Sequence, residues 1–132
     1  MHRPLAALAA ALPLFAAAPL AHAADRPRAD SAPCFFITQW RGWKAPSPDV
    51  IYLGVNNHDV YRADLSAGSP ELQWPDARLI NQVHGPDSIC SALDLQLEVS
   101  DGHGFRQGLI VKDLVKLTPD QVAAIPKKFN PN

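Results

Sequence analysis

Residues 88–99 constrain the fold more than any other stretch, because they combine a cysteine with a long alternating pattern. The apolar positions of this pattern are Leu93, Leu95, Leu97 and Val99, with polar residues between them. A period of two is typical of a strand that buries one face in a core and exposes the other. The stretch therefore predicts a half-buried central strand with Cys90 at its start.

Residues 1–23 have the organisation of a secretory signal peptide. Arg3 precedes an Ala- and Leu-rich run, and Ala21-His22-Ala23 has the small-x-small pattern of a cleavage site. Pro13 and Pro19 interrupt the run, which is shorter than the roughly 20 apolar residues that a membrane-spanning helix needs. We therefore predict that this leader is removed, and that the mature chain is periplasmic and not embedded in the membrane.

Cys34 is the only other cysteine, and it precedes the apolar run Phe35-Phe36-Ile37, which also predicts a strand. Two cysteines in a small exported chain are most simply one structural disulfide, because the compartment is oxidising. Neither a C-x-x-C spacing nor a cluster of His and Cys favours a redox pair or a metal site. We therefore predict a Cys34–Cys90 bridge. Cys90 has the parity of the polar residues Asp94 and Glu98, so we also expect either a covered face or a β-bulge at that end of the strand.

The composition beyond the leader limits the classes of partner. The remaining 109 residues carry eleven Lys or Arg and thirteen Asp or Glu, which is a formal charge of −2. Charge so close to neutral, and spread along the chain, provides no polybasic surface for nucleic acid or acidic lipid. A chain of this length suffices for one domain with a modest core.

Turn signals divide the mature chain into a lead-in, one domain and a tail. We expect residues 24–33 to be a disordered lead-in, residues 34–126 to form a single β-rich domain, and residues 127–132 to be a tail whose removal costs little stability. Within the domain we expect strands over residues 35–40, 49–55 and 60–65, a loop over residues 41–48, and a hairpin turn at Asn56-Asn57.

The second half of the domain is interrupted more often. Glycines and prolines break residues 66–87 repeatedly, so we expect a loop that places apolar anchors in the core, with a strand over residues 77–83. Between residues 105 and 117 the apolar positions change parity near Asp113. This change predicts either two short strands or a bulge.

The domain closes with the signature of a short capped helix. Thr118 is a typical N-cap, Pro119 suits the first helical position, and Gln121 completes a capping box. We expect a helix over residues 119–125 that ends at Pro126 and plugs one end of the sheet. The predicted fold is therefore α+β and mostly β: a small curled antiparallel sheet or partly open barrel of about five or six strands, with one short C-terminal helix.

The order of these features resembles that of the DUF6491 family, which comprises small exported proteobacterial proteins of unknown function. The stretches that carry the resemblance are Cys34-Phe35-Phe36, Ile51-Tyr52-Leu53-Gly54-Val55, Val60-Tyr61-Arg62-Ala63-Asp64-Leu65, Ile89-Cys90-Ser91 and the closing Leu117-Thr118-Pro119 helix. The resemblance covers nearly all of residues 34–126. It implies an envelope location and a compact β-rich domain, and it implies no activity.

The sequence carries none of the motifs that mark catalytic, cofactor or metal sites. His58, His84 and His103 all lie in predicted turns, without the H-x-H, H-x-x-x-H or H-E-x-x-H spacings of metal ligands. The nucleophile elbow, the phosphate loop and the dinucleotide fingerprint are also missing. We therefore predict no catalytic residue, no metal and no cofactor, and a non-enzymatic binding or structural module of the cell envelope. The alternative is a small hydrolase or metal-dependent enzyme that uses turn residues such as Asp101 and His103.

The most suggestive surface feature is Trp40-Arg41-Gly42-Trp43-Lys44, where two tryptophans alternate with two cations. We expect Trp40 in the core. Trp43 either stacks with Lys44 on a sugar ring or a peptide side chain, or folds back over the mouth of the barrel. The sequence thus predicts a binding surface at Trp43 and Lys44, with an envelope protein or a glycan as the partner.

Cleavage of the leader is directly testable. Mature protein recovered from the periplasm should begin at Ala24, because Ala21-His22-Ala23 matches the specificity of signal peptidases for small residues. Intact-mass measurement checks this. An intact Met1, or an acylated Cys34, would contradict both the cleavage and the localisation.

Overall fold

The computed structural model describes residues 33–82, 85 and 87–132. The predicted signal peptide, nearly all of the lead-in, and the residues Val83 and His84 lie outside the described residues.

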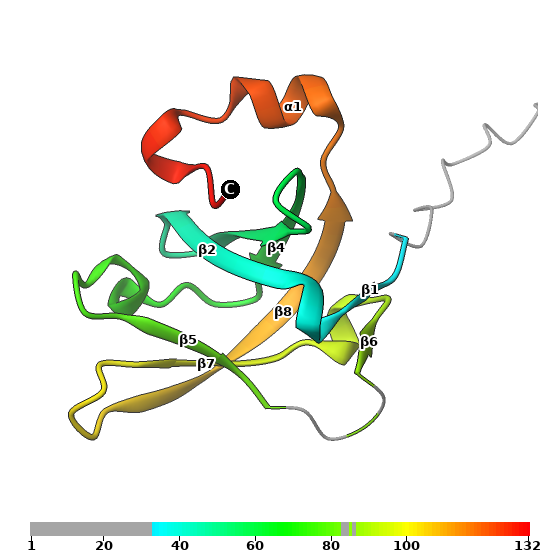
Figure 1. Ribbon diagram of the computed structural model, residues 1–132. Coiled ribbons are helices and arrows are strands. Elements are labelled where there is room, and N and C mark those ends of the chain that lie inside the picture. Colours follow the sequence, from blue (N-terminus) through cyan, green and yellow to red (C-terminus); the bar gives the residue numbers. More distant parts are fainter. Residues whose placement is uncertain (1–32, 83–84, 86) are drawn as a thin grey trace, which may run out of the picture.

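The chain folds into a nearly closed antiparallel sheet with the strand order β2-β3-β4-β8-β7-β5 (Figure 1). Its strands are β2 (Trp40–Ser47), β3 (Val50–Val55), β4 (Asp59–Leu65), β5 (Arg78–Asn81), β7 (Gln96–Ser100) and β8 (Arg106–Lys116). A second, two-stranded sheet pairs β1 (Phe35–Phe36) with β6 (Ser88–Ile89). The remaining elements are the 3-10 turns η1 (Ile37–Gln39), η2 (Pro70–Gln73), η3 (Ala92–Asp94) and η4 (Lys127–Phe129), and the helix α1 (Pro119–Ala124). The predicted fold class is confirmed.

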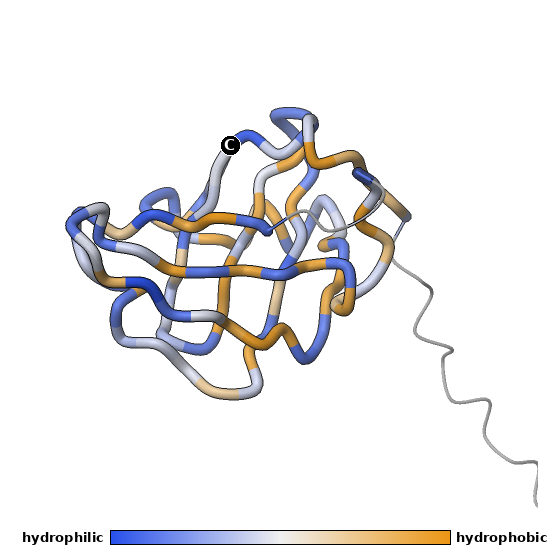
Figure 2. Tube along the Cα trace, turned by 90° about the horizontal axis from the view of Figure 1, so that it is seen from below, coloured by the Kyte–Doolittle hydropathy of each residue, from blue (hydrophilic) through white to orange (hydrophobic). Residues whose placement is uncertain are grey.

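The core fills the inside of the curled sheet. Buried and more exposed residues alternate along much of β7 and β8, and apolar and polar positions are interspersed along the chain trace (Figure 2). Ile51, Leu53 and Val99 are almost fully buried there, and Tyr61 is buried with its ring centroid 4.7 Å from that of Phe35. The alternation predicted for the central strand is confirmed at Leu95, Leu97 and Val99, which are all buried.

The predicted hairpin between β3 and β4 is confirmed. Asn56 and Asn57 have φ angles of 54° and 66°. These left-handed angles suit the tight turn of a right-twisted hairpin, and Asn tolerates them better than most residues.

The predicted disulfide is present, since Cys34 and Cys90 are bonded. It lies beside the pairing of Phe35 with Ile89, so the bond fastens the start of the domain to the segment that precedes the central strand. The described start is also held by the Tyr61 hydroxyl, which donates a hydrogen bond of 2.6 Å to the carbonyl of Pro33.

The predicted loop over residues 41–48 was wrong, because these residues form most of β2. Gly42 and Pro46 disfavour a central strand, but β2 is an edge of the sheet, where a missing ladder hydrogen bond costs little. The pairing with β3 shifts register on either side of Lys44, between Trp40 and Gly42 and again between Lys44 and Ser47. The sequence pattern is therefore that of an irregular edge strand.

The central strand also begins later than predicted. Residues 92–94 form η3, and Leu93 is 87% exposed instead of buried. The Asp94 carboxylate accepts hydrogen bonds from the backbone N–H groups of Cys90 and Ser91, and these bonds stabilise the turn and lower the pKa of that carboxyl. The turn interrupts the alternation, which explains why Cys90 does not share the parity of the buried leucines.

The change of parity in the last strand is a β-bulge. Asp64 pairs with Asp113 and Leu65 pairs with Val111, so one extra residue of β8 stands between two successive pairs. The bulge lets Leu109, Val111 and Leu114 all reach the core. Within the interrupted segment, the strand predicted over residues 77–83 is observed as β5.

The capping box of the C-terminal helix is confirmed. The Gln121 N–H donates to the Thr118 hydroxyl at 3.3 Å, and the Thr118 N–H donates to the Gln121 side-chain oxygen at 2.9 Å. Ile125 is buried, whereas Val122 is half-buried. The helix lies near the turn of the β3–β4 hairpin (Figure 1).

Residues 127–132 are not the free tail that the sequence predicts. They fold back over the outer face of β2 and β3, where Gly42 pairs with Gly54. A side chain at Gly54 would meet Asn132 and Pro131, and one at Gly42 would meet the carbonyl of Pro131. The Asn132 amide also donates to the carbonyl of Asp59 at 3.2 Å. The tail is thus seated on the sheet, and removing it should cost stability.

Removal of the disulfide should destabilise the fold markedly. The bond joins residues 56 positions apart, and the chain-entropy model gives about 4 kcal/mol for a loop of this size. Cys90→Ser should therefore lower the melting temperature. Reductant should lower the wild-type melting temperature to the same level and leave that of Cys90→Ser unchanged. A wild-type melting temperature that does not respond to reduction would contradict a structural role.

The contact of the C-terminal residues Pro131 and Asn132 with Gly54 can be tested by substitution. In Gly54→Ala the new methyl group would lie 2.5 Å from the Asn132 side chain and 3.1 Å from the Pro131 carbonyl. Overpacking of this kind costs about 1–3 kcal/mol. Urea unfolding should show this loss in the full chain but not in a chain that lacks residues 131 and 132. Gly108→Ala is the matched control, because a methyl group there meets open space. An equal loss in both backgrounds would show that the tail does not lie on Gly54.

Candidate functional site

The structure places Trp43 and Lys44 at a cleft of about 410 Å³. Trp43 pairs with Leu53 across the sheet and lies half-buried against the core, whereas Lys44 is exposed. Trp43 packs on the core and also lines the cleft, and its predicted role in stacking on a ligand stays a prediction. Trp40 is half-buried beside it, and its indole N–H donates to the carbonyl of Gly42 at 2.7 Å.

Three segments that are distant in the sequence form this cleft, which we call the Trp43 cleft. Its lining residues are Trp43, Lys44 and Ala45 from β2, Leu72, Gln73, Trp74, Pro75 and Ala77 from η2 and the residues that follow it, and Lys128 and Phe129 from η4. The C-terminal segment contributes to the cleft only because it folds back over β2. The cleft therefore depends on the packing of residues 127–132 against Gly42 and Gly54.

Hydrogen bonds hold η2 against β2. The Gln73 amide donates to the carbonyl of Ala45 at 3.0 Å, and the Ser69 N–H donates to the carbonyl of Pro48 at 2.8 Å. Ser69 is fully buried, and its hydroxyl donates to the Glu71 carboxylate at 2.6 Å. This hydrogen bond lowers the pKa of the Glu71 carboxyl. One wall of the cleft is thus preformed.

Two further aromatic rings join Trp43 at the cleft. Trp74 is 41% exposed, and its ring centroid lies 5.3 Å from that of Phe105 in a tilted arrangement that fixes its orientation. The Lys128 ammonium lies over the Phe129 ring at 4.6 Å from the ring centroid, and this distance is within the range of a cation–π contact. Aromatic surface is therefore available on both sides of the opening.

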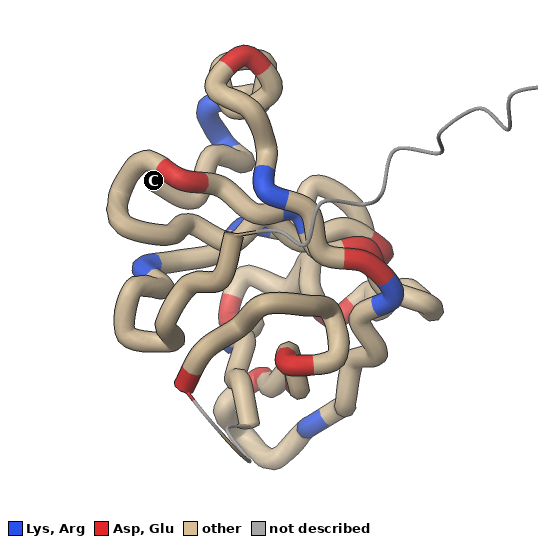
Figure 3. Tube along the Cα trace, turned by 90° about the vertical axis from the view of Figure 1, so that its right-hand side faces the viewer, with Lys and Arg blue, Asp and Glu red and all other residues tan. Residues whose placement is uncertain are grey.

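The charged groups of the cleft are cations. Within the described part of the chain, neither Lys44 nor Lys128 has a carboxylate within 4.0 Å. Elsewhere, acidic and basic residues are interspersed along the trace (Figure 3). Two ammonium groups without a carboxylate partner at one cleft favour an anionic group on whatever binds there.

Sequence reasoning identified only part of this site. It named Trp43 and Lys44 but missed Trp74, Lys128 and Phe129. Trp74 belongs to the interrupted segment, whose apolar residues the sequence predicts to be anchors in the core, but it is 41% exposed. Its position before a proline in a loop was the available signal, since an aromatic residue in a loop often contacts a partner. No local pattern indicates that the C-terminal segment returns to β2.

The two histidines that the structure describes, His58 and His103, do not converge. His58 Nε2 lies 3.9 Å from Asp59 Oδ2, and His103 Nε2 lies 3.9 Å from Asp76 Oδ2. Asp101 instead organises its own turn, because its carboxylate accepts hydrogen bonds from the backbone of His103 at 2.7 Å and of Phe105 at 3.0 Å. These bonds lower the pKa of the Asp101 carboxyl. Over residues 33–82, 85 and 87–132, no three His, Cys, Asp or Glu side chains are grouped so as to hold a metal ion.

None of the described helices combines the length and the apolar character needed to cross a membrane. Comparisons of the chain with protein-family models, with curated proteins and with solved structures find no match.

Proposed function

We propose that this chain is an exported, non-enzymatic binding module of the periplasm, and that it recognises an acidic glycan of the cell envelope in the Trp43 cleft. The observation that carries the proposal is the convergence of Trp43, Trp74 and Phe129 with Lys44 and Lys128 from three separate segments.

The disulfide supports export. A Cys34–Cys90 bridge indicates an oxidising, extracytoplasmic setting, since cytosolic thiols are kept reduced. The resemblance to the DUF6491 family, which we include in the proposal, implies the same setting and supplies no activity. The alternative of a hydrolase or metal-dependent enzyme is supported by no grouping of the described histidines.

The chemistry of the cleft suits a sugar better than an extended protein surface. Its volume of about 410 Å³ lies within the range of roughly 300–1,000 Å³ that is usual for small-ligand sites. The apolar C–H faces of pyranose rings pack on aromatic rings, and Trp74 presents such a ring to solvent. Lys44 and Lys128 then supply charge-assisted hydrogen bonds to a carboxylate on the sugar. An acidic glycan meets both requirements.

A matched pair of disaccharides tests the proposal. N-acetylglucosaminyl-N-acetylmuramic acid and chitobiose share two pyranose rings, but only the first carries a carboxylate. Calorimetry should show binding of both, with the acidic sugar bound about tenfold more tightly, because one charge-assisted contact is worth about 1.4 kcal/mol. Trp74→Ala should weaken both sugars, whereas Lys44→Gln should weaken only the acidic one.

Lys112→Gln provides the control for charge removal, because Lys112 is an exposed residue of β8 that does not line the cleft. It should leave both affinities unchanged. Equal affinity for the two sugars would contradict recognition of an acidic group. Failure of both sugars to bind would overturn the glycan proposal as a whole.

A further inference from the structure

A second hollow lies under the C-terminal segment and shares no lining residue with the Trp43 cleft. Its volume is about 670 Å³, and the β3–β4 hairpin end forms its floor. Residues 117–132 arch over it before they return to the sheet (Figure 1). We call it the arch pocket.

The arch is fastened at both ends. At its start, the Leu117 N–H donates to the carbonyl of Val60 at 2.8 Å. At its end, the Asn132 amide donates to the carbonyl of the adjacent Asp59 at 3.2 Å. The capping box of Thr118 and Gln121 fixes the turn between these two points. The roof of the pocket is therefore built without a ligand, so little ordering entropy would be lost on binding.

The walls of the arch pocket are mostly aliphatic. They include Leu117, Pro119, Val122, Ala123 and Ile125. These side chains can exclude water from a ligand, but they offer it no hydrogen-bond partner. The part of a ligand that fills this space must therefore be a hydrocarbon.

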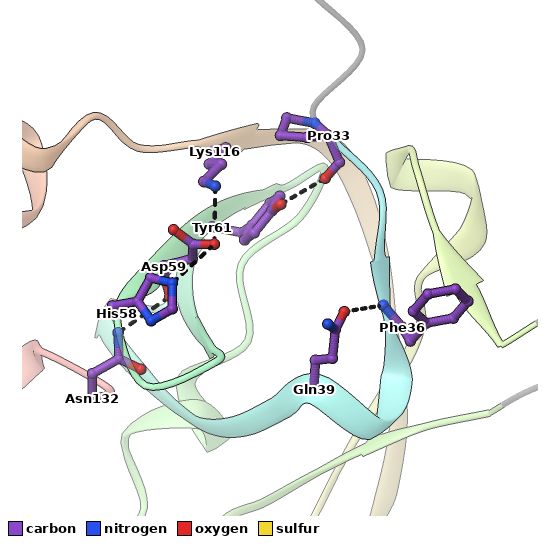
Figure 4. A network of polar contacts seen from close by, with 8 residues as sticks. All are labelled: Pro33, Phe36, Gln39, His58, Asp59, Tyr61, Lys116 and Asn132. Atoms are coloured by element: carbon purple, nitrogen blue, oxygen red, sulfur yellow. Dashed lines mark hydrogen bonds and ion pairs between the residues drawn. The ribbon is translucent and has the colours of Figure 1, made fainter.

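Three polar residues of the pocket, His58, Asp59 and Lys116, lie together near the turn of the hairpin (Figure 4). The Asp59 carboxylate lies 2.9 Å from the Lys116 ammonium and 3.9 Å from His58 Nε2, so its charge is already balanced within the protein. Lys127 also lines the pocket. In the part of the chain that the structure describes, no carboxylate lies within 4.0 Å of its ammonium. The pocket thus carries one uncompensated positive charge beside an apolar space.

We propose that the arch pocket binds a medium-chain fatty acid, with the hydrocarbon chain against the aliphatic walls and the carboxylate at Lys127. A neutral alcohol would leave the ammonium without its counter-charge, and an alkylammonium would be repelled by it. The site is separate from the glycan site and goes beyond the function proposed for it.

Decanoate, decanol and decyltrimethylammonium test this assignment by calorimetry below their micelle concentrations. Decanoate should bind one to one, at least tenfold more tightly than the other two. Between hexanoate and decanoate, affinity should rise about fourfold per methylene group, which corresponds to about 0.8 kcal/mol. Equal binding of decanoate and decanol would overturn the role of Lys127.

Two neighbouring lysines provide the matched variants. Lys127→Gln should weaken decanoate at least fivefold and leave the acidic disaccharide unaffected, whereas Lys128→Gln should do the reverse. Ala123→Phe, which fills the pocket, should abolish decanoate binding while the disaccharide still binds, and this retained binding shows that the variant is folded. If Ala123→Phe does not fold, Lys127→Gln decides alone. Decanoate binding that survives both substitutions, or no saturable binding to the wild type, would overturn the proposal.

Discussion

The close approach of the C-terminal segment to a pair of glycines determines the surface of this protein. Gly42 and Gly54 face each other on β2 and β3, and Pro131 and Asn132 occupy the space that side chains would otherwise fill. Val60, which pairs with Gly54, is also fully buried. Without this contact the last six residues would leave the sheet. The Trp43 cleft would then lose Lys128 and Phe129, and the arch pocket would lose Lys127 and Asn130.

A second constraint acts at the opposite end of the chain. The short pairing of β1 with β6 is too small to be stable alone, since two-stranded sheets are marginal in water. The disulfide holds these strands together covalently, and the buried rings of Phe35 and Tyr61 connect them to the core. Two different interactions thus hold the ends of the domain in place. One is a covalent bond near its start, and the other is close packing against two glycines near its end. Because a disulfide persists in an oxidising compartment, the Cys34–Cys90 bond indicates an extracytoplasmic setting.

Much of the fold was predictable because its signals are local. The alternation at Leu97 and Val99, the Asn56-Asn57 turn and the Thr118 capping box each depend on neighbouring residues, and each was read correctly. The predictions that were wrong concern residues whose conformation depends on contacts that a local pattern does not reveal. The pattern of residues 41–48 contains a glycine and two prolines, and only its position at the edge of the sheet makes it a strand. Leu93 continues an apolar alternation, but the Asp94 hydrogen bonds turn it outward. Seven of the ten residues that line the Trp43 cleft come from segments that no local pattern links to β2.

The geometry of η4 explains how one short segment serves two hollows. Successive residues of a 3-10 turn are rotated by about 120°, because the turn has three residues in each revolution. Lys127 and Lys128 are adjacent in the chain but therefore point in different directions, the first into the arch pocket and the second into the Trp43 cleft. Both side chains are positioned by the same backbone, which the seat at Gly42 and Gly54 holds in place. Ligands at the two sites would each favour the seated tail over the released one. Because the tail is already seated in the absence of a ligand, neither ligand would shift its population much, so we expect only weak coupling between the two hollows.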